Sequence, residues 1–313
     1  MIRRVLEAVP NFSEGRDLTL VGEIAAAMRR PGVEVLDWSA DPDHHRCVIT
    51  LIGDPGSVED AVVDAAAVAV EAIDLRRHQG VHPRIGALDV LPFVPLAGMQ
   101  MDDAVASAHR VGARIARELR VPIYWYGAAS NPPGRRLAAL RRGGFEGLVE
   151  GTGTDRAPDL VPDAWQHPGL HPTAGATCIG ARALLLAWNV YLYGLELAHA
   201  KAIAAAIREA GGGFRGLRAL AFRLPRRDAV QISMNIEDLS AVRPVEVYRR
   251  IEELAREHGG RAGETEVIGM MPDELVLSGA ADRMQLIEAD SGRLLSRRLA
   301  RHLTGSDAGT EAI

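Results

Sequence analysis

Hydrophobic residues recur along the chain at two spacings, and segments of the two kinds alternate. Short runs rich in valine, isoleucine and leucine are typical of buried strands, whereas apolar residues three and four positions apart are typical of amphipathic helices. In the first half these patterns predict strands at residues 5–10, 33–38, 47–52, 87–95 and 121–125, and helices at 18–28, 57–73 and 102–119. Strands that alternate with helices predict a sheet covered by helices.

The second half repeats this alternation. It predicts strands at residues 184–193, 217–224, 229–236 and 266–270, and helices at 196–210 and 244–258. Residues 131–172 form a connector rich in proline, glycine, aspartate and arginine, with one short basic helix predicted at 135–142. A connection this long inside a compact protein is usually functional or disordered. We therefore predict an N-terminal subdomain at 1–180, a C-terminal subdomain at 181–300 and a polar tail at 301–313, because a chain of 313 residues has room for two domains.

The turn at residues 41–46 indicates how the first sheet is connected. The strands on its two sides are close enough in sequence to form an antiparallel hairpin, so that parallel and antiparallel neighbours share one sheet. This favours an α/β protein of the α+β kind, with ferredoxin-like, split β-α-β subdomains whose mixed sheets are covered by helices. A purely parallel sheet of the Rossmann type stays open as the alternative.

Composition and charge exclude several classes of protein. The net charge of -5 and the isoelectric point near 6.1 argue against nucleic-acid binding, because phosphate neutralisation needs a basic surface. No stretch approaches the roughly 18 apolar residues of a membrane span, and the N-terminus lacks the apolar core of a signal peptide. We therefore expect a cytoplasmic protein without nucleic-acid or membrane partners. Cys47 and Cys178 are too isolated for a disulfide framework or a zinc site, and we expect buried thiols.

The strongest candidate for an active site is the loop at residues 75–92. It contains two histidines, three arginines and an aspartate, and Gly80 and Gly86 punctuate it. Loops of this kind carry catalytic side chains because a rigid scaffold can aim them. A histidine, with an ordinary pKa of about 6.5, both takes and gives a proton near neutral pH. His82, followed by a proline and by Arg84, is the catalytic candidate, and a structural role is the alternative.

Two further clusters follow predicted strand ends. Asn11 and Glu14 lie where α/β proteins commonly bind ligands, and a plain turn with Ser13 or Asp17 as the helix cap is the alternative. The hairpin tip carries the charged and imidazole side chains Asp41, Asp43, His44, His45 and Arg46. Such a tip suits a polar turn that faces a substrate, a divalent metal site or a solvated turn. The metal alternative lacks a helical i, i+4 pair or a distant ligand of matching type.

A fourth cluster ends the connector, at residues 169–182. Its sequence, Gly-Leu-His-Pro-Thr-Ala-Gly-Ala-Thr-Cys-Ile-Gly-Ala-Arg, is rich in small residues that let a ligand approach the backbone closely. This composition predicts a binding loop.

Taken together, the four clusters resemble the formiminotransferase family, whose members occur alone or fused to a cyclodeaminase. The stretches that carry the resemblance are Val-Pro-Asn-Phe-Ser-Glu-Gly at 9–15, His-Pro-Arg-Ile-Gly-Ala-Leu-Asp-Val at 82–90, Val-Pro-Ile-Tyr-Trp-Tyr-Gly at 121–127, Gly-Ala-Thr-Cys-Ile-Gly-Ala-Arg at 175–182, Gln-Ile-Ser-Met-Asn at 231–235 and Glu-Val-Ile-Gly-Met-Met-Pro at 266–272. They occur in order over about residues 5–290, which is far more specific than a single short motif. We expect no cyclodeaminase part.

The resemblance implies the reaction, its substrates and the catalytic histidine. The formimino group of N-formimino-L-glutamate passes to N5 of tetrahydrofolate, the co-substrate, in a homodimer whose two α/β subdomains are separated by a groove. The catalytic histidine falls on His82, a general acid and base, with an acidic partner among Asp37, Asp41 and Asp43 and with no metal. The residues expected to bind substrate or folate are Asn11, Glu14, His45, Arg46, Arg84, His171, Thr173, Gly175, Ala176, Thr177 and Arg182.

Two of these residues have a specific predicted role. Arg84 and Arg182 are candidates to clamp carboxylates of glutamate or folate, because a guanidinium pairs with a carboxylate through two parallel hydrogen bonds. Ordinary structural ion pairs are the alternative for both arginines.

The sequence also departs from the family near the expected pocket. Ser39 stands where an acidic residue is common, and His45 stands where an asparagine precedes the hairpin arginine. Either Asp41 takes over the acidic role, or the formimino donor is not formiminoglutamate. Two other functions stay open: a non-catalytic protein that binds folate or a carboxylate, and metal-dependent hydrolysis at the hairpin of residues 41–45.

Overall fold

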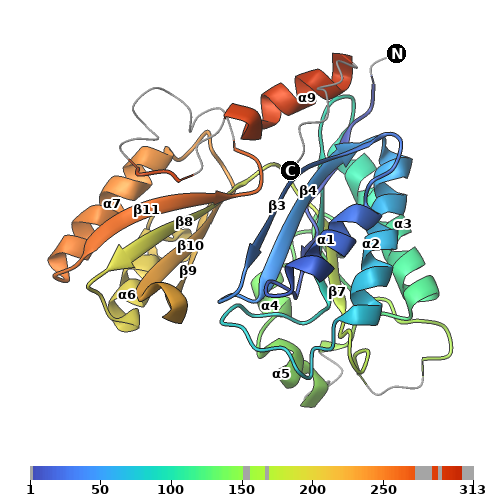
Figure 1. Cartoon of the computed structure of the whole chain (residues 1–313), viewed down its shortest axis with the longest axis horizontal. Helices are drawn as coiled ribbons and strands as arrows, with labels where there is room; N and C mark the ends of the chain where they lie inside the picture. Colours follow the sequence, from blue (N-terminus) through green and yellow to red (C-terminus); the bar gives the residue numbers. More distant parts are fainter. Residues whose placement is uncertain (1–2, 151–155, 166–168, 272–283, 288–290, 305–313) are drawn as a thin grey trace. The chain divides into compact units, whose positions relative to one another are not determined.

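The computed structural model describes residues 3–150, 156–165, 169–271, 284–287 and 291–304 (Figure 1). Contacts within the chain divide it into two units, Met1–Ala183 and Leu184–Ile313. Each unit has its own sheet and its own hydrophobic core.

The first unit is built on a seven-stranded sheet. Its strands are β1 (Leu6–Ala8), β2 (Asn11–Phe12), β3 (Val33–Asp41), β4 (Arg46–Gly53), β5 (Leu88–Pro95), β6 (Ile123–Gly127) and β7 (Thr177–Ala181). Its helices are α1 (Leu18–Ala27), α2 (Pro55–Ala72), α3 (Met101–Leu119), α4 (Leu137–Leu140) and α5 (Gly144–Glu150). The sheet is mixed, because β3, β4, β1, β2 and β5 pair antiparallel while β7 runs parallel to β5 and β6.

The order of these elements confirms the predicted topology. The segments β1, α1, β3, β4, α2 and β5 follow one another as a split β-α-β unit, and β3 and β4 form the predicted hairpin. Strands β1 and β2 keep one register on β4 and together replace the single strand expected at residues 5–10. The helix α1 begins after Asp17, whose carboxylate accepts hydrogen bonds from the backbone N–H groups of Thr19 and Leu20. Asp17 is therefore the predicted cap.

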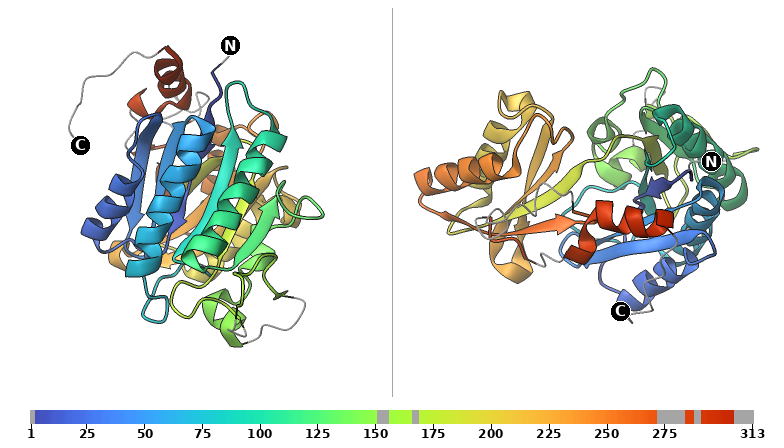
Figure 2. Two further views of the ribbon diagram at one scale, coloured as in Figure 1. Left: turned by 90° about the vertical axis from the view of Figure 1, so that its right-hand side faces the viewer. Right: turned by 90° about the horizontal axis from the view of Figure 1, so that it is seen from above.

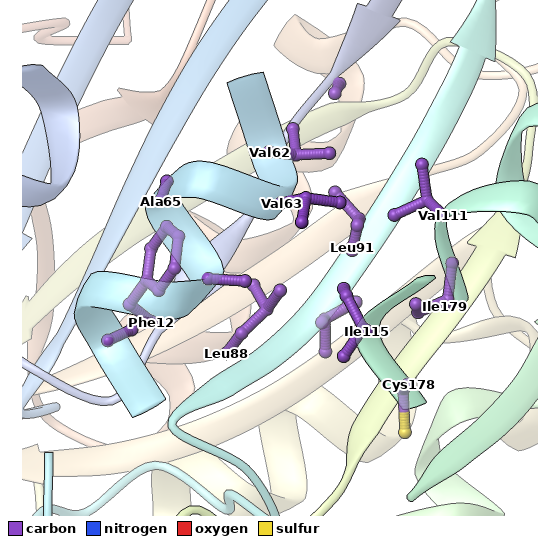
Figure 3. Packing of buried hydrophobic residues seen from close by; sticks show 14 of the residues in the cluster. Phe12, Val62, Val63, Ala65, Leu88, Leu91, Val111, Ile115, Cys178 and Ile179 are labelled. Atoms are coloured by element: carbon purple, nitrogen blue, oxygen red, sulfur yellow. The ribbon is translucent and has the colours of Figure 1, made fainter. Parts of the chain in front are cut away.

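Helices α1, α2 and α3 lie along one face of this sheet (Figure 2). Apolar side chains from both layers fill the space between them, and Figure 3 shows Leu91 of β5 in one cluster with Val63 of α2 and Val111 and Ile115 of α3. Cys47 and Cys178 are free, buried thiols, as expected. Because strand side chains alternate in direction, the polar residues of the same strands project from the opposite face.

The second unit contains a four-stranded antiparallel sheet in the order β11, β8, β10, β9. Its elements are β8 (Leu186–Tyr193), α6 (Leu197–Ile207), η2 (Glu209–Gly211), β9 (Leu217–Leu224), η3 (Pro225–Arg227), β10 (Ala229–Ile236), α7 (Pro244–Glu257), β11 (Arg261–Ile268), η5 (Ser291–Arg293) and α9 (Leu295–Thr304). The chain order strand, helix, strand, strand, helix, strand with this strand arrangement is ferredoxin-like. The predicted fold class is therefore confirmed in both units.

Three elements differ from the sequence prediction. Strand β11 begins at Arg261, five residues before the predicted start, because its charged residues alternate with apolar ones and hide the apolar run. The connector contains the additional helix α5. The helix α9 includes residues 301–304 of the predicted tail, with leucines at 295, 299 and 303 forming one apolar stripe, and residues 305–313 lie outside the described residues.

Candidate functional site

Two loops of the first unit are fixed to the histidine-rich loop that precedes β5. Arg16 donates through Nε to the carbonyl of Pro42 at 3.0 Å and through Nη2 to the carbonyl of Gln79 at 2.7 Å. The backbone N–H of Val81 donates to the carbonyl of Asp43 at 3.1 Å. The turn after β2, the tip of the hairpin between β3 and β4, and the loop before β5 are thus fixed to one another.

The glycines of the loop serve close packing. A Cβ atom at Gly80 would lie 2.3 Å from the carbonyl oxygen of His44, and one at Gly86 would lie 2.1 Å from the carbonyl oxygen of Ala176. Real Cβ atoms do not approach backbone atoms this closely. Both positions therefore need glycine because another segment of the chain passes there.

His82 lies at the centre of this assembly. Its Nδ1 lies 2.8 Å from the carbonyl oxygen of Pro83 and 3.1 Å from Nη1 of Arg46. The His44 ring stacks on it at 5.6 Å between ring centroids, with the planes 29° apart. The side chain is partly buried. The catalytic candidate therefore contacts a cation, a carbonyl and a second imidazole.

The two contacts at Nδ1 correspond to two different tautomers. The Pro83 carbonyl accepts a hydrogen bond only when Nδ1 carries the proton, which leaves a lone pair on Nε2. Arg46 donates to Nδ1 only when that atom carries the lone pair, which places the proton on Nε2. The first form presents a lone pair on Nε2, as a general base requires. The Pro83 carbonyl also accepts from Nδ1 when both ring nitrogens carry protons, which is the form that acts as a general acid.

A buried aspartate joins His82 to a network of arginines. Asp89, 1 % exposed, accepts hydrogen bonds at Oδ2 from Arg46 at 3.2 Å and from Arg141, and at Oδ1 from the backbone N–H of Ile85 at 2.8 Å. Arg46 also donates to Oδ1 of Asn11. Because Ile85 lies three residues after His82, one carboxylate fixes both the loop and the arginine that contacts the imidazole.

The electrostatics of this network keep His82 neutral. Burial lowers the pKa of His82 well below its ordinary value of 6.5, and the nearby cations Arg46 and Arg141 lower it further. Burial also lowers the pKa of Arg46 to about 10, which still leaves its guanidinium charged at neutral pH. Two arginines and one aspartate leave a net positive charge beside the ring, and a positive charge disfavours a second one.

A second group of side chains supports the neighbouring hairpin tip. His45 lies with Nε2 3.1 Å from Oε1 of Glu14 and with Nδ1 3.0 Å from the carbonyl of Gln79. Its ring stacks on His78 at 4.1 Å, and Nε2 of His78 donates to the carbonyl of His45 at 2.7 Å. Oε1 of Glu14 also accepts from three consecutive backbone N–H groups. Glu14 and His45 therefore hold the shape of the turn.

Two of the candidate acidic partners, Asp37 and Asp41, lie on strand β3. Oδ1 of Asp41 accepts from the backbone N–H groups of Asp43 and His44, both at 2.8 Å, so this carboxylate shapes the hairpin turn. Asp37 lies on the same face of β3 four residues earlier, opposite Thr50, roughly 13 Å along the strand. The structure also joins a further carboxylate, that of Asp89, to the His82 network.

Arg84 is engaged by a carboxylate of the protein itself. Its Nη1 and Nη2 donate to the two carboxylate oxygens of Glu146 at 2.9 and 2.6 Å, and Nη2 also donates to the carbonyls of Leu75 and His78. The predicted clamp therefore holds helix α5 to the loop, which corresponds to the alternative of a structural ion pair. Arg182 donates to the carbonyl of Ala183 at 3.0 Å, beside the buried Glu7, whose pKa burial raises to about 7.

The stretch at residues 169–182 is a turn that leads into strand β7. Ala176 is buried, and β7 begins at Thr177 between β5 and β6. Gly175, with a φ of +70°, has its Cα so close to the carbonyl oxygen of Ile85 that a Cβ would lie 1.9 Å away. The small residue at this position thus admits the chain's own histidine loop.

His171 and Thr173 fix the same contact. Nδ1 of His171 accepts from the backbone N–H groups of Thr173 and Ala174, and the carbonyl of Thr173 accepts from the N–H of Leu75 at 2.9 Å. These candidate binding residues therefore position the beginning of the His82 loop.

Sequence reasoning missed four residues of the site: Asp89, Arg141, His44 as a ring partner of His82, and His78 as a support of His45. A signal for Asp89 was present, because a charged residue inside the apolar run of β5 must have a partner when it is buried. Arg141 carried no such signal, since it lies in a basic segment 52 residues away.

Two general features complete the description of the site. Within the described ranges, no group of three or more His, Cys, Asp or Glu side chains converges as metal ligands do. Across those same ranges, none of the helices combines the length and the apolar character needed to cross a membrane.

Comparison with known proteins gives matches along nearly the whole chain. Residues 5–182 match the N-terminal subdomain of the formiminotransferase domain, and residues 187–291 match the formiminotransferase domain. The glutamate formimidoyltransferase of Streptococcus pyogenes serotype M1 is 37% identical over 96% of this chain and 99% of its own length. That of Thermoplasma acidophilum is 39% identical over 94% and 97%. The formimidoyltransferase-cyclodeaminase of Rattus norvegicus is 36% identical over 89% of this chain and 52% of its own length. The chain therefore belongs to the formiminotransferase family.

Proposed function

We propose that this enzyme transfers the formimino group of N-formimino-L-glutamate to N5 of tetrahydrofolate, with His82 as the general base and acid. The observation that carries the proposal is an imidazole whose Nδ1 contacts the Pro83 carbonyl and the Arg46 guanidinium, within a chain that matches the family along nearly its whole length. Neutral histidine is the form that accepts a proton at physiological pH.

The proposed chemistry needs one proton to move between two nitrogens. N5 attacks the amidine carbon, a C–N bond forms, and Nε2 of His82 takes the proton that N5 loses. The tetrahedral intermediate then collapses as the bond to the glutamate nitrogen breaks. His82 returns the proton to that nitrogen, so that glutamate leaves as an amine. One side chain serves both steps, because the neutral imidazole takes the proton and the imidazolium that results gives it back.

The remaining candidates have four proposed roles. Arg46 and Arg182, which have cationic guanidinium groups, are proposed to attract the carboxylates of formiminoglutamate. Asn11 is proposed to orient Arg46. The side chains of Glu14, His45 and Arg84 are proposed to keep the loops in place, as are the residues of the segment 171–177. Asp37 and Asp41 are proposed to add negative charge on the sheet face that carries Arg46.

The direct test is a transfer assay with the purified protein. Tetrahydrofolate and formiminoglutamate are expected to yield 5-formiminotetrahydrofolate, which is measured by its ultraviolet absorbance. A chelator added to the assay should not change the rate. Product formed only with another formimino compound would indicate a changed donor, as Ser39 and His45 suggest. Tight folate binding without turnover of any formimino donor would contradict the proposal and favour a binding protein.

The pH dependence of kcat/KM should reveal the neutral imidazole. Because the pKa of His82 lies below 6.5, the base form persists as the pH falls from about 7.5 to about 6.5. Activity is then lost as the pH falls through the lowered pKa, since the ring takes up a proton. In Arg141→Met, which removes one nearby cation, the acid limb should move to higher pH. An acid limb above pH 6.5 in the parent protein would contradict this assignment.

A homodimer and a cytoplasmic location are further expectations that the resemblance carries. Both are part of the proposal, in which small-molecule substrates are the partners of the site.

A further inference from the structure

His45, at the tip of the hairpin between β3 and β4, faces a hydrogen-bond acceptor with each of its ring nitrogens. Nδ1 lies 3.0 Å from the carbonyl oxygen of Gln79, and Nε2 lies 3.1 Å from Oε1 of Glu14. A neutral imidazole has one N–H donor and one lone pair, so it can donate to only one of these two acceptors. Both contacts are hydrogen bonds at the same time only when both nitrogens carry protons, and the ring is then a cation.

Neither acceptor can act as the donor instead. A carbonyl oxygen carries no proton. Oε1 of Glu14 also accepts from the backbone N–H groups of the next three residues, at 2.8, 2.7 and 3.0 Å. Burial raises the pKa of Glu14, but these N–H groups, together with the nearby His45, outweigh burial and hold the pKa below its ordinary value. Glu14 is therefore an ionised acceptor at neutral pH.

The ring that stacks on His45 is neutral. Nε2 of His78 donates to the carbonyl oxygen of His45 at 2.7 Å, and Nδ1 of His78 has no hydrogen-bond partner among the described residues. Burial lowers the pKa of His78 to about 4, so this ring carries one proton at neutral pH. The ring centroids lie 4.1 Å apart, with the planes 10° from parallel. A cation over the face of a neutral aromatic ring is attracted to it, whereas two charged rings would repel each other.

The surroundings of His45 compensate a positive charge. The side chains of His45 and Glu14 are only 13% and 15% exposed, and a charge this buried needs an opposite charge and hydrogen bonds. The Glu14 carboxylate and the Gln79 carbonyl supply both. The other charged groups on the hairpin tip and on the two segments fixed to it by these contacts are Arg16, Asp41, Asp43, Arg46 and Arg84.

The two donors of His45 hold the catalytic loop from the side of the hairpin. Gln79 lies three residues before His82. The residue after His45 is Arg46, whose Nη1 lies 3.1 Å from Nδ1 of His82. His45 has a φ of +51°, in the left-handed region that costs energy for most residues, and such a backbone persists where contacts over-determine it. Loss of either hydrogen bond of His45 would therefore displace the loop, the guanidinium or both.

We infer that His45 works as an imidazolium and is a positioning residue for His82. The two histidines then need opposite charge states, because His82 takes a proton as a neutral ring while His45 holds the loop only as a cation. When the pH rises and His45 loses one proton, one of its two hydrogen bonds must break. The inference rests on the proposed function, to which it adds the residue that limits the reaction on the alkaline side.

The charge state is measured by NMR of the nitrogen-labelled imidazole rings, which does not depend on turnover. At about pH 7 both ring nitrogens of His45 should carry protons, while His78 and His82 should each show one protonated nitrogen. The signals that disappear in His45→Asn assign the ring. A His45 ring with a single proton at this pH overturns the inference.

His45→Asn tests the positioning role. Asparagine adopts a positive φ more readily than most residues, so the backbone of the tip is kept, but its short amide cannot reach both acceptors. At about pH 7 we expect kcat to fall about 10-fold, since a displacement of about 1 Å can cost about 100-fold, with KM for both substrates nearly unchanged. As the pH rises, kcat of the parent protein should approach that of the variant, because the parent loses the same contacts.

Glu14→Gln keeps an oxygen for the backbone N–H groups and removes the negative charge beside His45. Because an anion favours the charged ring, His45 should titrate at lower pH in this variant, and its kcat should approach that of His45→Asn at correspondingly lower pH. His258→Asn, the same substitution at an exposed ring at the end of α7, is the control. It should leave kcat and its pH dependence as in the parent protein.

A ratio of kcat between parent and His45→Asn that stays constant with pH overturns the inference while transfer by the parent protein still stands. A lower melting temperature of His45→Asn with unchanged kcat also overturns it, because the contacts of His45 are then only structural. A parent protein that shows the imidazolium by NMR but transfers no formimino group contradicts the proposed function alone.

Discussion

Replacing His82 with alanine is expected to lower kcat for formimino transfer about 10²- to 10⁴-fold, the usual contribution of a positioned general acid or base. The imidazole is partly buried and contacts Pro83 and Arg46, so no other group reaches the same point without a rearrangement of the loop. Affinity for 5-formyltetrahydrofolate should change little, because the loss concerns proton transfer. Initial rates followed by ultraviolet absorbance, together with calorimetric binding, measure the two effects separately.

Two controls separate chemistry from folding. His258→Ala removes an exposed imidazole at the end of α7 and should keep parent activity. Added imidazole should restore part of the activity of His82→Ala and none of the activity of an unfolded variant. If kcat of His82→Ala equals that of the parent protein, the histidine takes no part in the mechanism.

The elements of the fold were largely predictable because they depend on local periodicity. The hairpin between β3 and β4 and the helices α1 and α7 follow directly from the spacing of apolar residues, which is a property of neighbouring positions. The incorrect predictions for β11 and α9 have local causes too. In β11, alternating charges conceal the apolar face, and in α9 a high density of arginine resembles a solvated tail.

The site was predictable only where its residues are neighbours in sequence. His82 and the hairpin were recognisable because several chemically active residues lie together within a few positions. The contacts of Asp89 with Arg46 and Arg141 span 43 and 52 residues, and no pattern of spacing encodes which arginine reaches a buried carboxylate.

Small residues illustrate a different ambiguity. A stretch such as the one at 169–182 signals that something approaches the backbone closely, but it does not say what. Here the partner of Gly175 and Ala176 is the chain itself, because the carbonyl of Ile85 accepts from the N–H of Ala176 at 2.9 Å. The segment is thus important for the site through the position of His82.

The second large effect is expected for Asp89→Asn. The substitution preserves shape and leaves an oxygen for the N–H of Ile85, but it removes the negative charge between Arg46 and Arg141, whose side chains are 16% and 11% exposed. Removing one partner of a buried ion pair typically costs about 3–5 kcal/mol, because the remaining charges stay buried without compensation. We expect a loss of that size in the free energy of unfolding, measured with urea at neutral pH.

The matched control is Asp159→Asn in the same unit, which breaks an ion pair with Arg135 that is more exposed, at 33% and 23%, and should cost about 0–1 kcal/mol. The double variant Asp89→Asn, Arg141→Met should recover part of the stability, since one uncompensated cation is gone.

Catalysis supplies an independent readout. Without the Asp89 charge the positive field at His82 grows and its pKa falls further, so the acid limb of kcat/KM should move to lower pH, opposite to its shift in Arg141→Met. Equal stabilities for Asp89→Asn and Asp159→Asn would show that the carboxylate is not what holds the two arginines beside the imidazole.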